Sequence, residues 1–403
     1  MARAPQIASA QAAAPLATRA FLLLCCAMFL GYANHWMLTP VIPLYVDALG
    51  GSAFVAGLAL LAFSIPSFVV RPFVGRIADR WNAPGVLAIG LVLLALGSFA
   101  LIWPLLVLVF VGNIVRGLGW AGLNTGGYTT LASAAPAQRR GEAAGYYTSA
   151  TSGAAIVFPA LGLWLLAMPG TFSTVLLGAA FFTLLGLPFA LPLTRAAADA
   201  RASRPVGDAP TAGLLDRGVL IATGLNLCCT LAMPSVMAFL PLYARSLGIA
   251  HIGLFYVIAG ATNIVVRPLL GRWSDAMGRG PAIALGLGAQ LVGLALIFMA
   301  NDLVLILAGG VFVALAMAMT GSTTTALAMD LANPRSRGHA MATFSISFQL
   351  GAGVGGIIAG AAADLLGLRA MYAASIAITL CGFGLLANGW KLLPRPAAGA
   401  DRV

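Results

Sequence analysis

The chain has 403 residues, of which 61% are hydrophobic and only 8% are charged, and its formal net charge is +11 at pH 7. A soluble domain has about 25% charged and about 45–50% apolar residues, so a water-soluble class is excluded. The positive charge does not indicate a nucleic-acid partner, because the arginines lie in short loops between apolar runs rather than on one polar domain. The composition predicts a protein that is embedded in lipid.

Long apolar runs follow one another along most of the chain. Each run has roughly 20 residues or more, which is the length that a helix needs to cross a hydrocarbon core of about 30 Å. We therefore predict an all-α membrane protein with twelve transmembrane helices. The predicted helices lie at 19–45, 53–72, 84–102, 105–132, 142–167, 171–191, 216–243, 251–268, 281–300, 303–331, 339–363 and 369–391.

The longest polar stretch, residues 194–215, divides these helices into two sets of six. It has no hydrophobic periodicity and is expected to be a flexible cytoplasmic linker. An N-terminal six-helix bundle is predicted at 19–193 after a tail at 1–18, and a C-terminal six-helix bundle at 216–391 before a tail at 392–403. The chain is expected to be a monomer.

The basic residues predict the orientation in the membrane. Of the 22 basic residues, Arg245 and Arg369 fall on one side of the twelve-helix arrangement, Arg116 falls inside a helix, and the other 19 fall on the opposite side. Short cytoplasmic loops carry an excess of Lys and Arg. Both termini are therefore expected in the cytoplasm, in a multi-pass protein of the inner (cytoplasmic) cell membrane.

Two sequence stretches recur in the same order in both halves. RPFVGRIAD at 71–79 returns as RPLLGRWSD at 267–275, and Pro-Leu-Tyr at 43–45 returns at 241–243. Matched landmarks in one order indicate that the six-helix unit was duplicated. The two bundles are therefore predicted to be pseudo-symmetric.

These repeats resemble a loop motif of the major facilitator superfamily of secondary transporters, and the look of the chain is closest to its twelve-helix drug and metabolite efflux branch. The resemblance implies a conformational latch formed by Gly75, Arg76, Asp79, Arg80, Gly271, Arg272, Asp275 and Arg279. In a helix, Arg71, Gly75 and Asp79 share one face, and the glycine permits close approach of a neighbouring backbone. The alternative is a solvated charge cluster that only sets topology.

A charged side chain near the middle of the fourth predicted helix marks a candidate binding site. Arg116 lies deep in an apolar run, where a charge costs about 2.5–3.5 kcal/mol on insertion scales. Asn113, Arg116, Trp120 and Asn124 form one helical stripe, which we expect to line a water-filled cavity and bind a polar or anionic group. The alternative is an arginine held by a structural partner. The similar antiporters carry Arg where this chain has Asn113, so the role of their arginine is not transferred.

Further polar residues in the predicted helices are candidates for the same cavity. They are Tyr147, Asn226, Tyr256, Asn263 and Gln349. His35 is the deepest titratable residue, and an unperturbed pKa near 6.5 suits a proton-coupling role. The alternative for each is a bond to a neighbouring helix.

The predicted function is secondary active transport of a small organic solute by alternating access, as proton-coupled export, with protons and membrane lipid as further partners. The alternative is an uptake permease or facilitator for a small anionic metabolite. An enzyme is not expected, because no nucleophile with a base and no His/Asp metal cluster lies at matching depth. No cofactor or metal is predicted, and the absence of a Gly-Lys-Ser/Thr loop disfavours an ATP-driven pump.

Overall fold

The structure is a computed structural model that describes residues 18–134, 139–168, 171–200, 216–333 and 337–393. Within these ranges every regular element is a helix. The N-terminal half contains α1 (Arg19–Leu38), α2 (Val41–Ala48), α3 (Ala53–Val69), α4 (Arg71–Ile77), a π-helical turn (Ala78–Asn82), α5 (Ala83–Ala100), α6 (Leu106–Ala134), α7 (Arg140–Ala167), α8 (Phe172–Leu185) and α9 (Leu187–Ala200).

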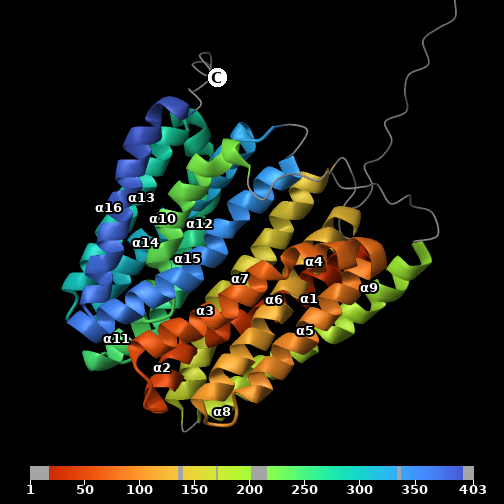
Figure 1. Ribbon diagram of the computed structural model, residues 1–403, viewed down its shortest axis with the longest axis horizontal. Helices are drawn as coiled ribbons and strands as arrows, with labels where there is room; N and C mark the ends of the chain where they lie inside the picture. The colour runs from red at the N-terminus through yellow and green to blue at the C-terminus, as the bar shows by residue number, and fades with distance from the viewer. Residues whose placement is uncertain (1–17, 135–138, 169–170, 201–215, 334–336, 394–403) are drawn as a thin grey trace, which may run out of the picture.

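The C-terminal half repeats this order with fewer breaks. It contains a 3₁₀ turn (Arg217–Val219), α10 (Leu220–Met237), α11 (Leu240–Ser246), α12 (Gly253–Met277), α13 (Arg279–Met299), α14 (Leu303–Leu331), α15 (Arg337–Leu366), α16 (Ala370–Gly389) and a 3₁₀ turn (Trp390–Leu392). Figure 1 shows this half, green to blue, beside the N-terminal half, red to yellow-green. The predicted all-α membrane fold is confirmed.

Ten helical segments of the described chain are long and apolar enough to cross a membrane. Two shorter apolar helices, Ala53–Val69 and Gly253–Arg267, lie at predicted spans as well. Several predicted spans are broken into two helices, and a proline stands at or near the breaks, as at Pro40 before α2 and Pro241 in α11. Proline has no N–H to donate and fixes its own backbone angle, so the axis changes there. The total of twelve spans stays a prediction.

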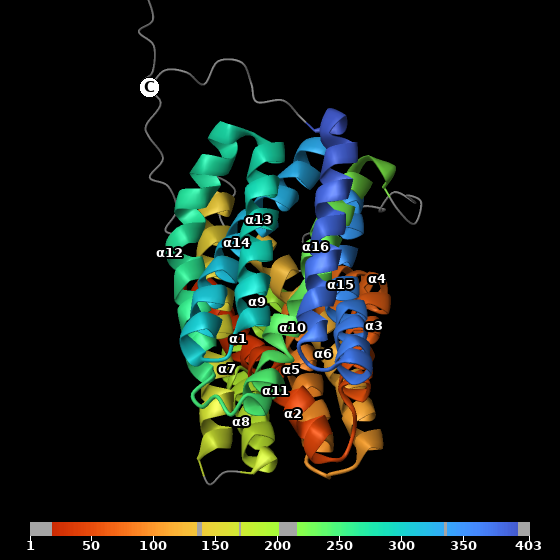
Figure 2. The same ribbon diagram turned by 90° about the vertical axis from the view of Figure 1, so that its left-hand side faces the viewer.

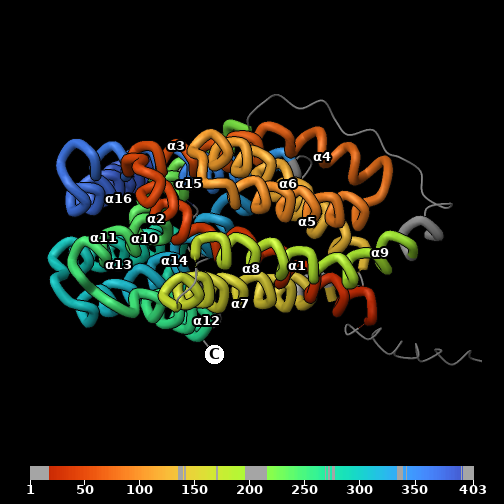
Figure 3. Tube along the Cα trace, turned by 90° about the horizontal axis from the view of Figure 1, so that it is seen from below, coloured from red at the N-terminus to blue at the C-terminus, as the bar shows by residue number. Residues whose placement is uncertain are grey.

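Two helix pairs form the boundary between the halves. α3 packs on α15 and α7 packs on α12, and both pairs are visible from below in Figure 3. Glycines permit the first contact, since a Cβ on Gly57 would overlap the backbone oxygen of Gly356, and one on Gly360 would overlap that of Ala53. Small residues of this kind let membrane helices approach closely.

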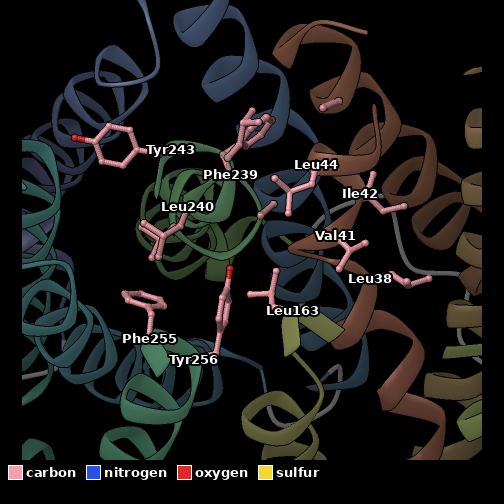
Figure 4. Close-up of a cluster of buried hydrophobic side chains, with 14 of the residues drawn as sticks. Leu38, Val41, Ile42, Leu44, Leu163, Phe239, Leu240, Tyr243, Phe255 and Tyr256 are labelled. Atoms are coloured by element: carbon pink, nitrogen blue, oxygen red, sulfur yellow. The ribbon is translucent and has the colours of Figure 1, made fainter. Parts of the chain in front are cut away.

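The packed core joins the two halves at one end only. One cluster of buried side chains includes Leu38 and Leu163 from the N-terminal half and Phe239 and Tyr256 from the C-terminal half, as Figure 4 shows. The two remaining clusters each belong to a single half. We call the end that carries α2 and α11, at the bottom of Figures 1 and 2, the closed end.

Polar contacts also cross between the halves at the closed end. The carboxylate of Asp364 in α15 accepts the backbone N–H groups of Ala53 and Phe54, at the first turn of α3, at 2.9 Å each. Arg245 pairs with Asp47 at 3.4 Å. A carboxylate at a helix N-terminus interacts favourably with the helix dipole, so Asp364 helps to hold α3 against α15.

The first repeat motif differs from its predicted helical geometry. α4 passes into the π-helical turn at Ala78, Asp79 is exposed, and no described atom lies within 4 Å of where a Cβ on Gly75 would be. The close backbone approach expected at Gly75 is therefore wrong for this structure. Arg76 and Arg80 are also exposed.

The second motif ends in a different turn. Gly278 has φ 89°, a backbone conformation that favours glycine, and Arg279 donates to Asp330 at 2.9 Å. The first copy has no glycine at this point and continues through the π-helical turn instead. The surroundings of Gly271 and the side chains of Arg272 and Asp275 lie outside the described residues.

Candidate functional site

Three adjoining hollows lie between the two halves. The first and second, of about 320 and 310 Å³, share Trp36, Met237, Met317, Gly321 and Phe348, so they form one continuous cavity. The third, of about 400 Å³, is lined by the first turns of α7 and by the middle of α12, and it adjoins the second hollow. The cavity therefore extends away from the closed end.

Aromatic rings from three helices form the N-terminal wall. The ring of His35 in α1 lies 5.1 Å from that of Phe63 in α3 and 4.4 Å from that of Trp120 in α6, centroid to centroid. Trp36 lies edge-on to His35 at 5.2 Å. The ring nitrogens of His35 make no hydrogen bond with a described residue, and His35 lines the cavity. This wall can stack on a planar solute and offer it an imidazole.

Arg116 lies behind this aromatic wall and does not line the cavity. Its side chain is buried; Nε donates to Oδ1 of Asn34 at 2.9 Å, and one terminal nitrogen donates to Oδ1 of Asn113 at 2.6 Å. Its guanidinium carbon lies 5.3 Å from the centre of the Phe63 ring. The expectation that Arg116 faces the cavity does not hold in this structure, because amides and an aromatic face already surround the charge.

Three other predicted residues also lie inside the N-terminal bundle. Asn113 donates to the Val109 carbonyl, and Asn124 accepts a hydrogen bond from the hydroxyl of Tyr32 at 2.7 Å. Tyr147 is buried, and its ring packs against Tyr128. The structure therefore separates this part of the predicted stripe from the cavity, and Trp120 alone among its four members reaches the surface of the cavity.

Predicted residues of the C-terminal half do line the cavity. Asn226 donates to Ser347 at 2.7 Å and accepts from Thr324 at 3.1 Å, so its amide joins three helices. Tyr256 donates to the Met237 carbonyl at 2.9 Å.

Two further amides complete this wall. Asn263 donates to the Ala314 carbonyl at 3.3 Å. Gln349 lines the cavity, and its amide makes no hydrogen bond within the described part of the chain. Gln349 is therefore the amide on this wall that is available to a solute.

The cavity has several lining residues that the sequence did not single out. Met233, Met237 and Met317 supply flexible thioethers that adapt to solutes of different shape. The indole N–H of Trp36 is buried without a partner in the described chain. Apolar residues in an apolar chain carry no sign of which face they occupy. Two missed residues did carry a signal, because each is polar inside an apolar run: Gln290, which lines the first hollow, and Asn34, which lies beside His35.

These features define a class of protein: a bundle of membrane-spanning helices in two matched halves around a central cavity is built for moving solutes. The chain belongs to the major facilitator superfamily, whose sequence profile matches residues 24–300 and 225–402. Members of this superfamily are transport proteins rather than enzymes.

Two similar proteins place the chain near the efflux branch of the superfamily, and a solved structure shares its fold. The staphylopine export protein of Staphylococcus aureus (strain Mu50 / ATCC 700699) is 23% identical over 91% of this chain and 95% of its own length. The quinolone resistance protein NorA of Staphylococcus aureus (strain MRSA252) is 26% identical over 34% of this chain and 35% of its own. The crystal structure of a POT family transporter in complex with 5-aminolevulinic acid covers 94% of this chain and 97% of its own, with 12% identity and a TM-score of 0.78, and shows the shared fold.

Proposed function

We propose that the chain exports a small organic solute from the cytoplasm by alternating access, with a proton gradient as the driving force. The observation that carries this proposal is a cavity with walls from both halves. Among the described residues, the buried apolar clusters of the two halves join only at the closed end. A rocking motion of the halves would close the other end and open this one. The export name of a relative that matches 91% of this chain supports the direction.

The open end of the cavity is proposed to face the cytoplasm. The motif segments at 71–82 and 267–279 carry arginines and lie toward the end opposite α2 and α11. Positive loops stay in the cytoplasm. A solute to be exported would therefore enter the cavity in the conformation described here, and Asp364 and the Arg245–Asp47 pair would form the outer gate.

The lining suggests a solute with an aromatic or apolar body and a few polar atoms. Rings, thioethers and the free Gln349 amide dominate the lining. Apolar pockets with a small number of polar groups bind by shape and burial, and the polar groups set orientation. Phe63, Trp120 and Phe348 are the proposed stacking surfaces.

His35 is proposed as the proton carrier. It is the cavity-lining residue whose ordinary pKa lies near neutrality, and no carboxylate of the described residues lines the three hollows. A proton bound to the imidazole in one conformation and released in the other would couple the gradient to solute movement.

The exposed first motif is proposed to act in the other conformation. Asp79 makes no ion pair among the described residues, whereas Asp364 is engaged at the closed end. When the halves rock, the contacts of Asp364 would break and Asp79, with Arg76 and Arg80, would meet the opposite half. The latch would then stabilise the outward-open state.

Inside-out vesicles containing the chain provide the test. With an acidic interior and a metabolite extract outside, we expect at least one solute to accumulate, as detected by mass spectrometry, and the accumulation to collapse when the gradient is dissipated. His35→Gln should abolish the response to the gradient and leave exchange of the same solute intact. Accumulation that ignores the gradient would contradict proton coupling, and no accumulation beyond vesicles without the chain would contradict export.

A further inference from the structure

The cavity carries positive charge that no carboxylate of the described residues balances. Arg267 of α12 lines both the second and the third hollow, is exposed, and has neither a hydrogen bond nor an ion pair to any described residue. Among the residues that line the three hollows, Arg267 is the one that carries a permanent charge. Its position is the first of the second repeat motif.

The equivalent residue of the first motif approaches the same region from the other half. Nε of Arg71 is buried and has no hydrogen-bond partner in the described chain. Arg71 lies within electrostatic range of the hydroxyls of Tyr32 and Tyr128, and Tyr128 is also within range of Arg267. Tyr32 lines the second hollow, so Arg71, which itself lines none of the three hollows, lies close to the part of the cavity that Arg267 lines.

Three other helix arginines have partners among the described residues, whereas arginines such as Arg76 are exposed on the surface. Arg116 is held by amides, Arg245 pairs with Asp47, and Arg279 pairs with Asp330. A buried guanidinium nitrogen without an acceptor is unfavourable, and a planar oxyanion is the acceptor that fits its geometry best. Arg71 and Arg267 therefore have no anionic partner among the described residues, as expected of a site that binds an anion from outside the chain.

We propose that Arg71 and Arg267 together bind the anionic group of the transported solute, so that the substrate class is an organic anion with an aromatic or apolar body. The anion would carry a carboxylate, sulfonate or phosphate. This inference rests on the proposed function, since it assumes that the cavity is the solute site. The duplication explains why the site has one arginine from each half.

Two probes with the same ring system test the assignment. 1-Anilinonaphthalene-8-sulfonate carries an anionic group, and N-phenyl-1-naphthylamine lacks it. Fluorescence titration of the full chain in phosphatidylcholine nanodiscs, with empty discs subtracted, should show tighter binding of the sulfonate. Arg71→Gln and Arg267→Gln should each weaken sulfonate binding by about tenfold or more, the expected effect of losing a charge-assisted hydrogen bond, and should leave the neutral probe unaffected.

Matched controls separate this effect from charge in general and from lipid. Arg195→Gln removes an exposed arginine of α9, outside the latch and the cavity, and should preserve sulfonate binding. Equal affinities of wild type for both probes would overturn the anion assignment but leave the cavity as a solute site, whereas binding of neither probe would contradict the proposed function as well. If added phosphatidylglycerol displaces the sulfonate only from wild type, the arginines hold a lipid headgroup and the assignment to the solute is wrong.

Discussion

The buried charge at Arg116 shows how one side chain acquires a structural role. Asn34 links it to α1 and itself donates to Ser98 of α5 at 2.8 Å, so three helices meet around the guanidinium. A buried charge is tolerated when amides and carbonyls satisfy its donors. Removing one acceptor leaves the charge in place and uncompensated, which is the costly change.

Asn34→Leu should therefore destabilise the N-terminal bundle. We expect a loss of about 2–3 kcal/mol of stability, because hydrogen bonds to charged groups contribute about that much. The decrease would appear in the thermal unfolding temperature of the purified protein. Gln349→Leu is the control, since it removes an amide that has no described partner and should leave this temperature nearly unchanged. Equal unfolding temperatures for the two variants would contradict the structural role of Asn34.

Replacing Phe348 tests whether the aromatic lining of the cavity binds the solute. Phe348 lies where the first and second hollows meet, so Phe348→Ala should weaken binding of N-phenyl-1-naphthylamine by roughly tenfold, in line with about 1.5–3 kcal/mol for a buried aromatic side chain. Phe73→Ala removes an exposed ring on α4 that lines none of these hollows and should bind the dye like wild type. The same loss in both variants would show that the dye reports lipid or surface.

The residues of the site could be foreseen only in part. Asn226, Tyr256, Asn263 and Gln349 stood out because they are polar in an apolar chain, and the structure places all four along the cavity. Arg116 stood out for the same reason, yet whether it faces the cavity depends on Asn34, which comes from another helix. That partner is a tertiary contact, and no spacing along the chain predicts it.

Among the helices, the pair α3 and α15 brings the backbones of the two halves into close contact. The pair depends on glycines of both helices, and its end is fixed by Asp364. Since lipid tails are as apolar as the helices, close packing rather than hydrophobic burial stabilises such a contact.

Gly57→Ala should loosen this pair and favour the conformation with the closed end open. The added methyl group would overlap the backbone oxygen of Gly356. In a cysteine-free background, a single cysteine at Ala352, which lines the cavity, should react faster with an impermeant maleimide added from the closed end. Gly288→Ala in α13, outside the latch, is the control, because open space surrounds that position. Unchanged labelling in Gly57→Ala would contradict the role of the packing.

Asp364→Asn should have a similar but smaller effect. It retains the shape of the side chain and weakens its interaction with the N-terminus of α3, which is worth about 1 kcal/mol. The same labelling assay should show a roughly fivefold larger open population. Asp302 caps α14 within one half, where its carboxylate accepts the backbone N–H of Leu305 at 2.8 Å. Asp302→Asn is therefore a matched control that should not affect gating. A response of equal size in both would assign the effect to helix capping alone.

The positions of the helices could be predicted from the sequence, but the breaks within the predicted spans could not. The prediction of a helix at 303–331 coincides with α14, and that at 142–167 lies within α7. Apolar runs report where lipid is crossed, but a proline inside such a run is compatible with either a kink or two separate helices. The π-helical turn at Ala78–Asn82 also had no signal beyond the departure of Trp81–Pro84 from the second copy.

For the whole molecule, the duplication explains both the similarity of the halves and their contact. Asp47 and Arg245 follow the two Pro-Leu-Tyr stretches at matching positions, and they pair with each other across the boundary. Positions related by a two-fold axis meet when they lie close to it. The repeat therefore predicted two like halves, whereas the choice of closed end could not be predicted, since one sequence must support both conformations.

The central claim is that transport requires the two halves to separate at the closed end. Locking that end tests this claim most directly. Asp47→Cys and Arg245→Cys, in a background without the five native cysteines, would be joined by a bifunctional maleimide. We predict that the cross-linked protein still binds N-phenyl-1-naphthylamine with the affinity of the unlinked protein but no longer accumulates solute in vesicles. Solute accumulation that continues after complete cross-linking would contradict the account.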